Sequence, residues 1–196
     1  MCPTLRQHYY LVISYRNRRC YFMYSAEDIT NYRCPRWNEF PDIDLYMDQV
    51  VSLIDKHTAV FAENDEEVIL TRTMINNYVK QKKIDPPKNK RYNKKHLAYF
   101  LVVGLLKKFM SLSEISEGIS IVRERHSTEE AYDLFCEVFE GSIKAVFLGI
   151  EGESFTSMRR DIALMHAVTL SYAHMLYARY LISMHKAQGN DDTQTL

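Results

Sequence analysis

The sequence predicts an all-α protein. Along most of the chain, apolar residues recur three and four positions apart, which is the period of an amphipathic helix. Residues that commonly cap helix N-termini stand in front of several of these stretches. Glycine and proline are scarce, at 6 and 5 of 196 residues, so long flexible linkers are not expected. A chain of this length can bury a core within one domain or two small ones.

The first 34 residues are expected to form an N-terminal extension. Two short aromatic and β-branched runs at residues 9–24 surround the sequence RNRR, and this pattern fits either a hairpin or a loosely attached arm. The turn-rich stretch that follows contains Trp37 and Phe40, whose large rings are expected to pin it to the core.

Six helical stretches follow the extension. Their expected bounds, in chain order, are residues 45–57, 72–81, 94–110, a short segment after Ser113, residues 127–140 and residues 155–186. The residues expected to cap them are Asp42 or Asp44, Thr71, Asn93, Ser113, and Ser127 or Thr128. Gly104 lies inside the third stretch, where glycine costs about 1 kcal/mol relative to alanine, so close packing against its backbone is expected.

Apolar spacing indicates which side of each helix is buried. In the second stretch, Met74, Ile75 and Tyr78 are expected to point inward. The buried face expected in the first stretch consists of Leu45, Val50, Leu53 and Ile54. The face expected in the fifth stretch consists of Tyr132, Phe135, Cys136 and Phe139. The face expected in the last stretch is Ile162, Met165, Thr169, Ala173, Leu176, Tyr180 and Met184. Its mean spacing is close to 3.67 residues, so a left-handed heptad zipper is not indicated.

Residues 162–178 carry no charge, but they are fewer than the roughly 20 apolar residues of a membrane-spanning helix. They also contain His166 and His174, which are costly in lipid and are expected to be satisfied core residues rather than metal ligands. A secretory signal is not expected, because a cluster of arginines follows the first apolar run. The four cysteines have no C-x-x-C spacing and are expected to be reduced thiols of a cytoplasmic protein.

Positive charge is concentrated in one segment of the chain. Residues 71–110 contain eleven lysines and arginines and a single acidic residue, Asp85, which gives a net charge of +10. Because the whole chain is neutral, the remaining residues carry a net −10. A concentrated positive field attracts phosphate, so a nucleic-acid partner and a merely solvated lysine surface are both consistent with this pattern.

Residues 71–119 have the element order of a winged helix-turn-helix. A short polar-faced helix precedes a proline-bounded basic segment, and a longer apolar helix and a short helix follow. A helix of this kind fits the major groove of duplex DNA, where asparagine side chains pair with the edge of adenine. This combination favours duplex DNA as the partner.

The segment TMINNYVKQKKI, with the later PP and RYNKKHLAYFLVVGLLKKFMSLSEI, resembles the DNA-binding half of MerR-type regulators. In that family a recognition helix leads to a proline-bounded wing, and a glycine usually ends the helix where this chain has Lys82. More closely, RWNEFPDIDLYMDQV with TMINNYVK and KNKRYNKKHLAY is similar to an uncharacterised bacterial family, known as a domain of unknown function and suspected to be transcriptional. The resemblance covers roughly residues 35–185 and implies a transcriptional regulator.

The residues expected to contact DNA lie on the helix at 72–81 and the wing at 86–92. Asn76 and Asn77 would read adenine and Arg72 would reach guanine, while lysines and a tyrosine hydroxyl would bind phosphates. The predicted contact set is Arg72, Thr73, Asn76, Asn77, Lys80, Lys82, Lys88, Lys90, Arg91 and Tyr92.

The expected organisation is an extension at 1–34, a DNA-binding domain at 35–122, a C-terminal helical domain at 123–188 and a disordered tail at 189–196. The C-terminal domain would supply a homodimer interface or bind a small-molecule effector. No cofactor, metal ion or membrane is expected as a partner.

Two other functions remain open. The basic segment could dock on an acidic protein partner without binding DNA, which would make the chain a protein–protein adaptor. No known catalytic motif is present, so an enzyme is not expected. A deep cleft with perturbed carboxylates or histidines would be the sign of an unrecognised active site.

Overall fold

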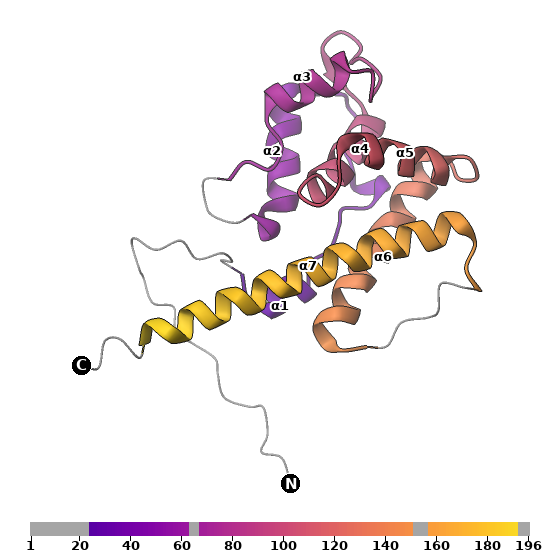
Figure 1. Cartoon of the computed structure of the whole chain (residues 1–196). Helices are drawn as coiled ribbons and strands as arrows, with labels where there is room; N and C mark the ends of the chain where they lie inside the picture. Colours follow the sequence, from indigo (N-terminus) through magenta and orange to yellow (C-terminus); the bar gives the residue numbers. More distant parts are fainter. Residues whose placement is uncertain (1–23, 63–66, 151–156, 192–196) are drawn as a thin grey trace.

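The computed structural model describes residues 24–62, 67–150 and 157–191 (Figure 1). Residues 9–23 of the expected hairpin or arm lie outside these ranges, as do residues 192–196 of the expected tail. Within the ranges the chain forms seven helices and one two-stranded sheet, so the all-α prediction is confirmed. The helices are α1 (Ala26–Thr30), α2 (Met47–Thr58), α3 (Arg72–Lys80), α4 (Lys94–Leu106), α5 (Leu112–Arg123), α6 (Thr128–Leu148) and α7 (Arg160–Asp191). The strands are β1 (Leu45–Tyr46) and β2 (Arg91–Tyr92), and single 3₁₀ turns cover Trp37–Glu39 and Ala59–Phe61.

Most predicted caps are confirmed. The side chains of Thr71, Asn93 and Ser127 accept hydrogen bonds from backbone N–H groups three residues further along, at the starts of α3, α4 and α6. The cap predicted for α5 was wrong by two positions: Ser111 caps this helix, and Ser113 lies inside it. Ser111 forms a capping box with Glu114 three residues later, whereas Ser113 has Ser116 at that position.

The start of α2 also differs from the prediction. Neither Asp42 nor Asp44 caps it, because Leu45 and Tyr46 form β1 and the helix begins after them. The backbone N–H of Tyr46 instead donates to the side-chain oxygen of Gln49 at 2.9 Å. Leu45 is only 6 % exposed, so strand pairing and burial, rather than a capping carboxylate, determine this start.

The apolar helix α4 occupies the centre of the core. Ten of its thirteen residues are buried, and its apolar side chains point in all directions, so other elements must cover it on every side. At Gly104, where close packing was predicted, a methyl group would lie 3.5 Å from Cγ2 of Ile54 and 3.6 Å from Cγ2 of Ile69, which is ordinary van der Waals contact, so alanine would also fit. The helix ends at Leu106, one turn earlier than expected.

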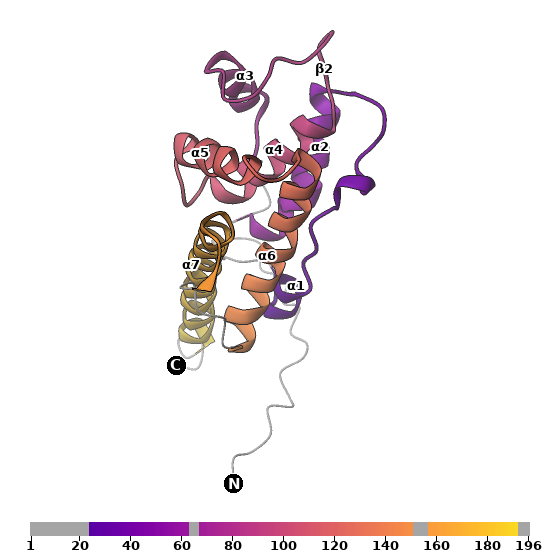
Figure 2. The same ribbon diagram turned by 90° about the vertical axis from the view of Figure 1, so that its right-hand side faces the viewer.

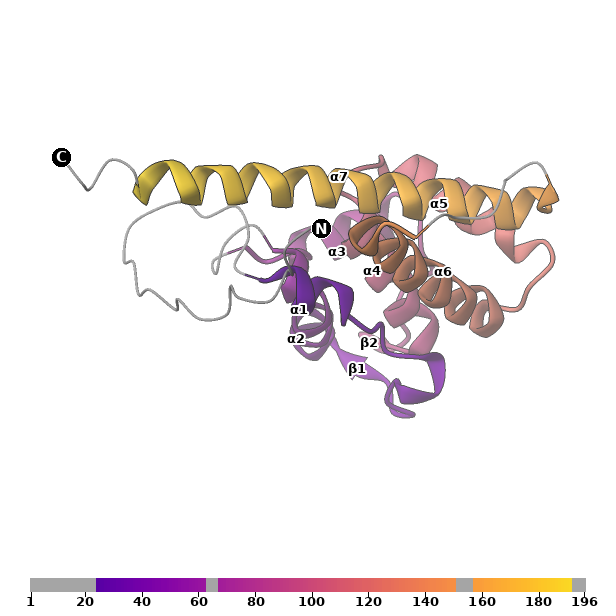
Figure 3. The same cartoon turned by 90° about the horizontal axis from the view of Figure 1, so that it is seen from below.

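Helices α6 and α7 form the second part of the core and run in the same direction. Ser142 and Thr169 share a buried hydrogen bond of 2.8 Å, and further along both helices the rings of Phe147 and Tyr180 lie 5.7 Å apart. Figure 3 shows that the last turns of α7 extend beyond the other helices. The helix begins at Arg160 and continues to Asp191, so residues 189–191 are helical rather than part of a tail.

The predicted apolar faces of these helices are largely confirmed. The buried members are Tyr132, Phe135, Cys136 and Phe139 on α6 and Met165, Thr169, Ala173 and Leu176 on α7. On the protruding end of α7, Met184 is 43 % exposed. Among the described helices, none is long and apolar enough to span a membrane.

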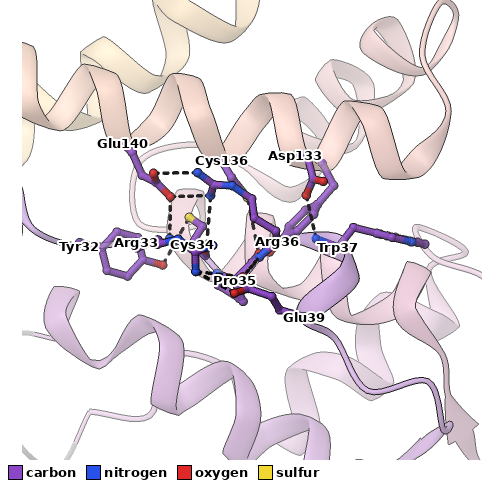
Figure 4. A network of polar contacts seen from close by, with 11 residues as sticks. Tyr32, Arg33, Cys34, Pro35, Arg36, Trp37, Glu39, Asp133, Cys136 and Glu140 are labelled. Carbon is purple, nitrogen blue, oxygen red and sulfur yellow. Dashed lines mark hydrogen bonds and ion pairs between the residues drawn. The ribbon is translucent and has the colours of Figure 1, made fainter.

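The extended segment before the first 3₁₀ turn is tied to α6 by polar contacts (Figure 4). The guanidinium of Arg36 donates to both carboxylate oxygens of Glu140, at 2.6 and 2.9 Å. The backbone N–H of Cys34 donates to the same carboxylate at 2.8 Å, and that of Trp37 donates to Asp133 at 2.8 Å. These bonds satisfy backbone groups that no sheet partner reaches.

Apolar contacts hold the same segment in place, as predicted. Phe40 is 3 % exposed and packs against Tyr132 with ring centroids 5.1 Å apart, while Trp37 is half-buried beside it. Cys34 and Cys136 are buried free thiols, while Cys2 and Cys20 lie outside the described residues. Burial raises the pKa of the Cys34 thiol well above its usual range, so this thiol stays protonated.

We predict that Glu140→Gln destabilises the protein by about 3 kcal/mol, because it leaves the largely buried guanidinium of Arg36 without its counter-charge. Chemical denaturation measures the loss. Glu39→Gln, which removes the exposed partner of Arg33, is the matched control and should cost less than about 1 kcal/mol. Equal losses in the two variants would contradict a special role for the Glu140 pair.

Candidate nucleic-acid interface

Helix α3 has one buried face and one exposed polar face. Ile75 is fully buried, and Met74 and Tyr78 are partly buried against the core, as the spacing predicts. Asn76 and Asn77 are exposed, and so are the other members of the predicted contact set on this helix, Arg72, Thr73 and Lys80. The asparagine side chains are therefore available to a partner.

The end of α3 is formed by a residue in a left-handed conformation. Lys82 has φ 54°, and the chain reverses here through two backbone hydrogen bonds, Lys82 N–H to Val79 C=O and Lys83 N–H to Tyr78 C=O. This pair of bonds defines a Schellman motif, in which glycine is the usual residue at the left-handed position. The motif turns Lys82 and Lys83 away from the helix axis directly after α3.

The basic segment that follows forms a tight hairpin turn. Asn89 and Lys90 have φ 51° and 60°, the N–H of Arg91 donates to the C=O of Lys88 at 2.9 Å, and the two residues form an antiparallel bridge. Positive φ at both central positions is the requirement of a type I′ turn, which suits asparagine. The exposed side chains of Lys88, Lys90 and Arg91 therefore extend from a short rigid tip.

Strand pairing fixes where this hairpin turn lies. Leu45 pairs with Tyr92 and Tyr46 with Arg91, which places the turn beside the start of α2. The guanidinium of Arg91 lies 4.4 Å from the centre of the exposed Tyr46 ring and donates to its hydroxyl at 2.7 Å. Figures 1 and 2 show α3, the 81–90 connection and β2 together at one end of the molecule, away from α6 and the C-terminus. We call this end the basic surface; its exposed cations are Arg72, Lys80, Lys82, Lys88, Lys90 and Arg91.

A buried histidine closes the base of the hairpin. His96 is 6 % exposed; its Nδ1 lies 3.1 Å from the backbone N of Asn93, and its Nε2 lies 3.1 Å from the carbonyl oxygen of Asp85. Nδ1 also lies 2.7 Å from Oδ1 of Asn93, so a hydrogen on either ring nitrogen has an acceptor. Burial lowers the pKa of His96, which favours the neutral ring. The ring thus links the two chain segments on either side of the basic turn.

Tyr92 does not belong to the exposed surface. It is 3 % exposed, and its ring packs against His96 and Phe100 with centroids 5.4 and 5.8 Å away. The expected phosphate contact placed this residue outside, but alternation along β2 turns its side chain inward while Arg91 points outward.

Some cations of the basic segment 71–110 interact with other residues of the protein instead of pointing freely into solvent. Lys108 binds the carboxylate of Glu67 at 2.7 Å. Lys107 is half-buried with its Nζ 3.5 Å from the sulfur of Met74, and burial lowers its pKa. Arg72 contacts Asp48 at 2.6 Å, but both side chains are about two-thirds exposed, so this pair is weak and can exchange for another partner.

Two residues that support the basic surface were missed by sequence reasoning. Asn89 lies between lysines at a position where only glycine, asparagine or aspartate fits well, and that preference is a usable signal. His96 lies directly after the basic run in the sequence; it takes part in the cap of α4 and is buried. Among the described residues, no group of three or more His, Cys, Asp or Glu side chains could hold a metal ion.

Comparison with known proteins gives one family. The profile of a domain of unknown function (DUF1836) matches residues 35–135, which include the whole basic surface, α2 to α5 and the first third of α6. No curated protein and no solved structure is significantly similar to the chain.

We predict that Lys82→Gly stabilises the protein by about 0.5–1 kcal/mol, because glycine adopts the left-handed conformation without the steric cost that lysine carries. The midpoint of urea unfolding reports this change. Lys80→Gly, two residues earlier at the last position of α3, is the matched control and should destabilise the protein, because glycine is unfavourable at a right-handed helical position. A loss of stability in both variants would contradict the assigned motif.

We predict that His96 makes stability depend on pH. Because its folded pKa is lowered, the unfolded chain binds a proton first, so stabilisation is present above about pH 6.5 and is lost as pH falls below that value. In His96→Gln, the decrease in melting temperature between pH 7.5 and 5.5 should be smaller than in the wild type. His174→Gln, at an exposed position on α7, should keep the wild-type decrease; an unchanged decrease in His96→Gln would refute the assignment.

Proposed function

The chain belongs to the DUF1836 family of domains of unknown function, and from this premise we propose that it binds duplex DNA and regulates transcription. The observation that carries the proposal is the basic surface itself. An exposed helix face with Asn76 and Asn77 lies at the same end of the molecule as the lysines of the 88–91 turn, so one duplex could meet both.

The residues of this surface have two different roles, contact with base edges and contact with phosphates, which follow from the chemistry of DNA. Helix α3 is the element that fits the major groove, where Asn76 and Asn77 can each form two hydrogen bonds with adenine. The lysines at its end and in the connection that follows supply phosphate contacts, which fix register but carry no sequence information. Arg72 can exchange its exposed partner Asp48 for a guanine edge.

The order of elements supports a MerR-like winged helix-turn-helix. Helices α2 and α3 are followed by the hairpin turn as the wing and by α4, and the wing strand β2 pairs with β1 directly before α2. The left-handed Lys82 occupies the place where MerR-type proteins usually have glycine. Such a regulator would work in the cytoplasm of a bacterial cell, which is the origin that the resemblance implies.

The proposed regulator binds DNA as a homodimer. The protruding end of α7 exposes Leu181 and Ile182 by 50 and 52 %, and the end of α6 exposes Leu148 by 62 %. Contact between two copies through these residues would bury apolar surface that a monomer leaves in water. Two-fold symmetry then predicts DNA half-sites about 34 Å apart or a multiple of that distance.

The test is equilibrium binding of the full chain to labelled duplex DNA. If a dimer contacts six to ten phosphates, affinity should fall by about 10³–10⁵ between 50 and 200 mM salt. Lys88→Ala with Lys90→Ala should weaken binding to all sequences and reduce the salt slope by about two per subunit. No duplex binding at low salt would overturn the proposal and favour a protein–protein adaptor, whose basic surface contacts an acidic partner.

Base readout is tested separately. Bound sequences are selected from a random duplex pool with the wild type and with an Asn76→Ala, Asn77→Ala variant. We expect the variant to retain salt-dependent binding but to lose about 1–3 kcal/mol of preference for each base pair that an asparagine reads. Ser171→Ala, on the exposed side of α7, is the control. An unchanged preference in the double variant would show that these asparagines do not read bases.

A further inference from the structure

A cleft of about 750 Å³ lies between the end of α3 and the helices α4, α5, α6 and α7. Small-molecule sites in proteins commonly enclose about 300–1,000 Å³ and are mainly apolar with a few polar groups. This cleft belongs to neither the exposed face of α3 nor the hairpin turn. It connects the basic surface to the C-terminal helices.

The wall of the cleft is mainly apolar and is built from four helices. Val102 on α4, Ile115 on α5, Phe135 on α6 and Met165 on α7 all line it, and each is less than 10 % exposed. Tyr99 adds a hydroxyl group that shares a hydrogen bond of 2.9 Å with the hydroxyl of Ser116. An occupant must therefore be largely apolar.

The charged groups around the cleft are unevenly distributed. Lys82, Lys83 and Lys95 line the end next to α3, where Asp85 is their acidic neighbour. The carboxylate of Glu114, also at this end, already accepts hydrogen bonds from the N–H and hydroxyl of Ser111, at 2.8 and 2.7 Å. The positive charge of the three lysines is therefore only partly balanced.

Two further carboxylates line the cleft. They belong to Glu117 on α5 and to Glu124 directly after this helix, and Arg123 lines the cleft next to Glu124. An elongated molecule with one negative end would therefore be oriented, with its charge toward the lysines and away from these carboxylates.

We propose that this cleft binds an amphipathic carboxylate, with its hydrocarbon chain between α4, α5, α6 and α7 and its head group beside Lys83. Lys83 is the best placed of the three cations, because it is half-buried and its Nζ lies 3.3 Å from the hydroxyl of Ser113. A bound carboxylate replaces this neutral partner with a charged one.

The site gives the protein a means of regulation, and this step rests on the proposed DNA binding. Lys82 lines the cleft and also belongs to the basic surface, since it follows α3 directly. A carboxylate bound at this end reduces the positive charge that DNA phosphate meets. The ligand therefore weakens DNA binding, and DNA weakens ligand binding by the same factor.

The site is tested without DNA by calorimetric titration of the full chain with decanoate, below the concentration at which it forms micelles. We expect saturable binding of one decanoate per chain, and binding of decan-1-ol that is about tenfold weaker, since the alcohol lacks the charge. Decyltrimethylammonium should bind still more weakly. Equal affinities for the three probes, or no saturation with decanoate, would overturn the proposal.

Two variants locate the binding. Lys83→Met keeps the apolar stem but removes the charge, so it should weaken decanoate about tenfold and leave decan-1-ol unchanged. Val168→Trp fills the cleft from α7 and should abolish binding of both probes. Lys144→Met, on the exposed surface of α6, is the control. Circular dichroism verifies that each variant is folded; folded variants that bind decanoate as the wild type does would place the site elsewhere.

The regulatory step is measured last, as duplex affinity with and without saturating decanoate. We expect at least a fivefold loss in the wild type and no loss in Val168→Trp. An unchanged affinity would overturn the regulation but not the site, which the calorimetry decides. If no duplex binds under any condition, the DNA-binding proposal and its regulation both fail, and the decanoate titration still decides the site.

Discussion

The requirement to cover α4 on every side determines the arrangement of this protein. Ten of its thirteen residues are buried, so other elements must cover most of its surface. Helix α2 packs against α4 at Gly104, where Ile54 and Thr58 lie at van der Waals distance from the position of a methyl group. The connection after α3 carries part of the basic surface and also lines the cleft, whose other walls are formed by α4 to α7. A charge-bearing surface and an apolar recess are thus built on the same helix.

Local backbone geometry converts a charged stretch of sequence into an ordered surface. Two left-handed positions, at Lys82 and at Asn89–Lys90, fold the chain back without a long loop. His96 then bonds to both segments that flank the hairpin turn, and burial keeps its ring neutral. Because these restraints lie beneath the lysines, the cations are presented from a short rigid support rather than from a flexible segment.

A long-range ion pair provides a second restraint on the fold, in addition to the hydrogen bonds of His96. Arg36 and Glu140 join the segment before α2 to the middle of α6, across more than a hundred residues of sequence. The pair is largely shielded from solvent, and the N–H of Cys34 adds a third bond to the same carboxylate. This contact holds α6, on which α7 packs, against the segment that leads into α2.

Sequence by itself determined the features that depend on neighbours along the chain. Helical periodicity predicted the buried faces of α3, α6 and α7, and short-range hydrogen bonding predicted the caps at Thr71, Asn93 and Ser127. Other features depend on contacts between residues far apart, which no local pattern contains. Pairing with Leu45 turns Tyr92 inward, the ion pair with Glu67 engages Lys108, and the packing of four helices creates the cleft. The amount of positive charge could therefore be counted from the sequence. Only the tertiary structure decided which cations face solvent, because burial and ion pairing are properties of the folded arrangement.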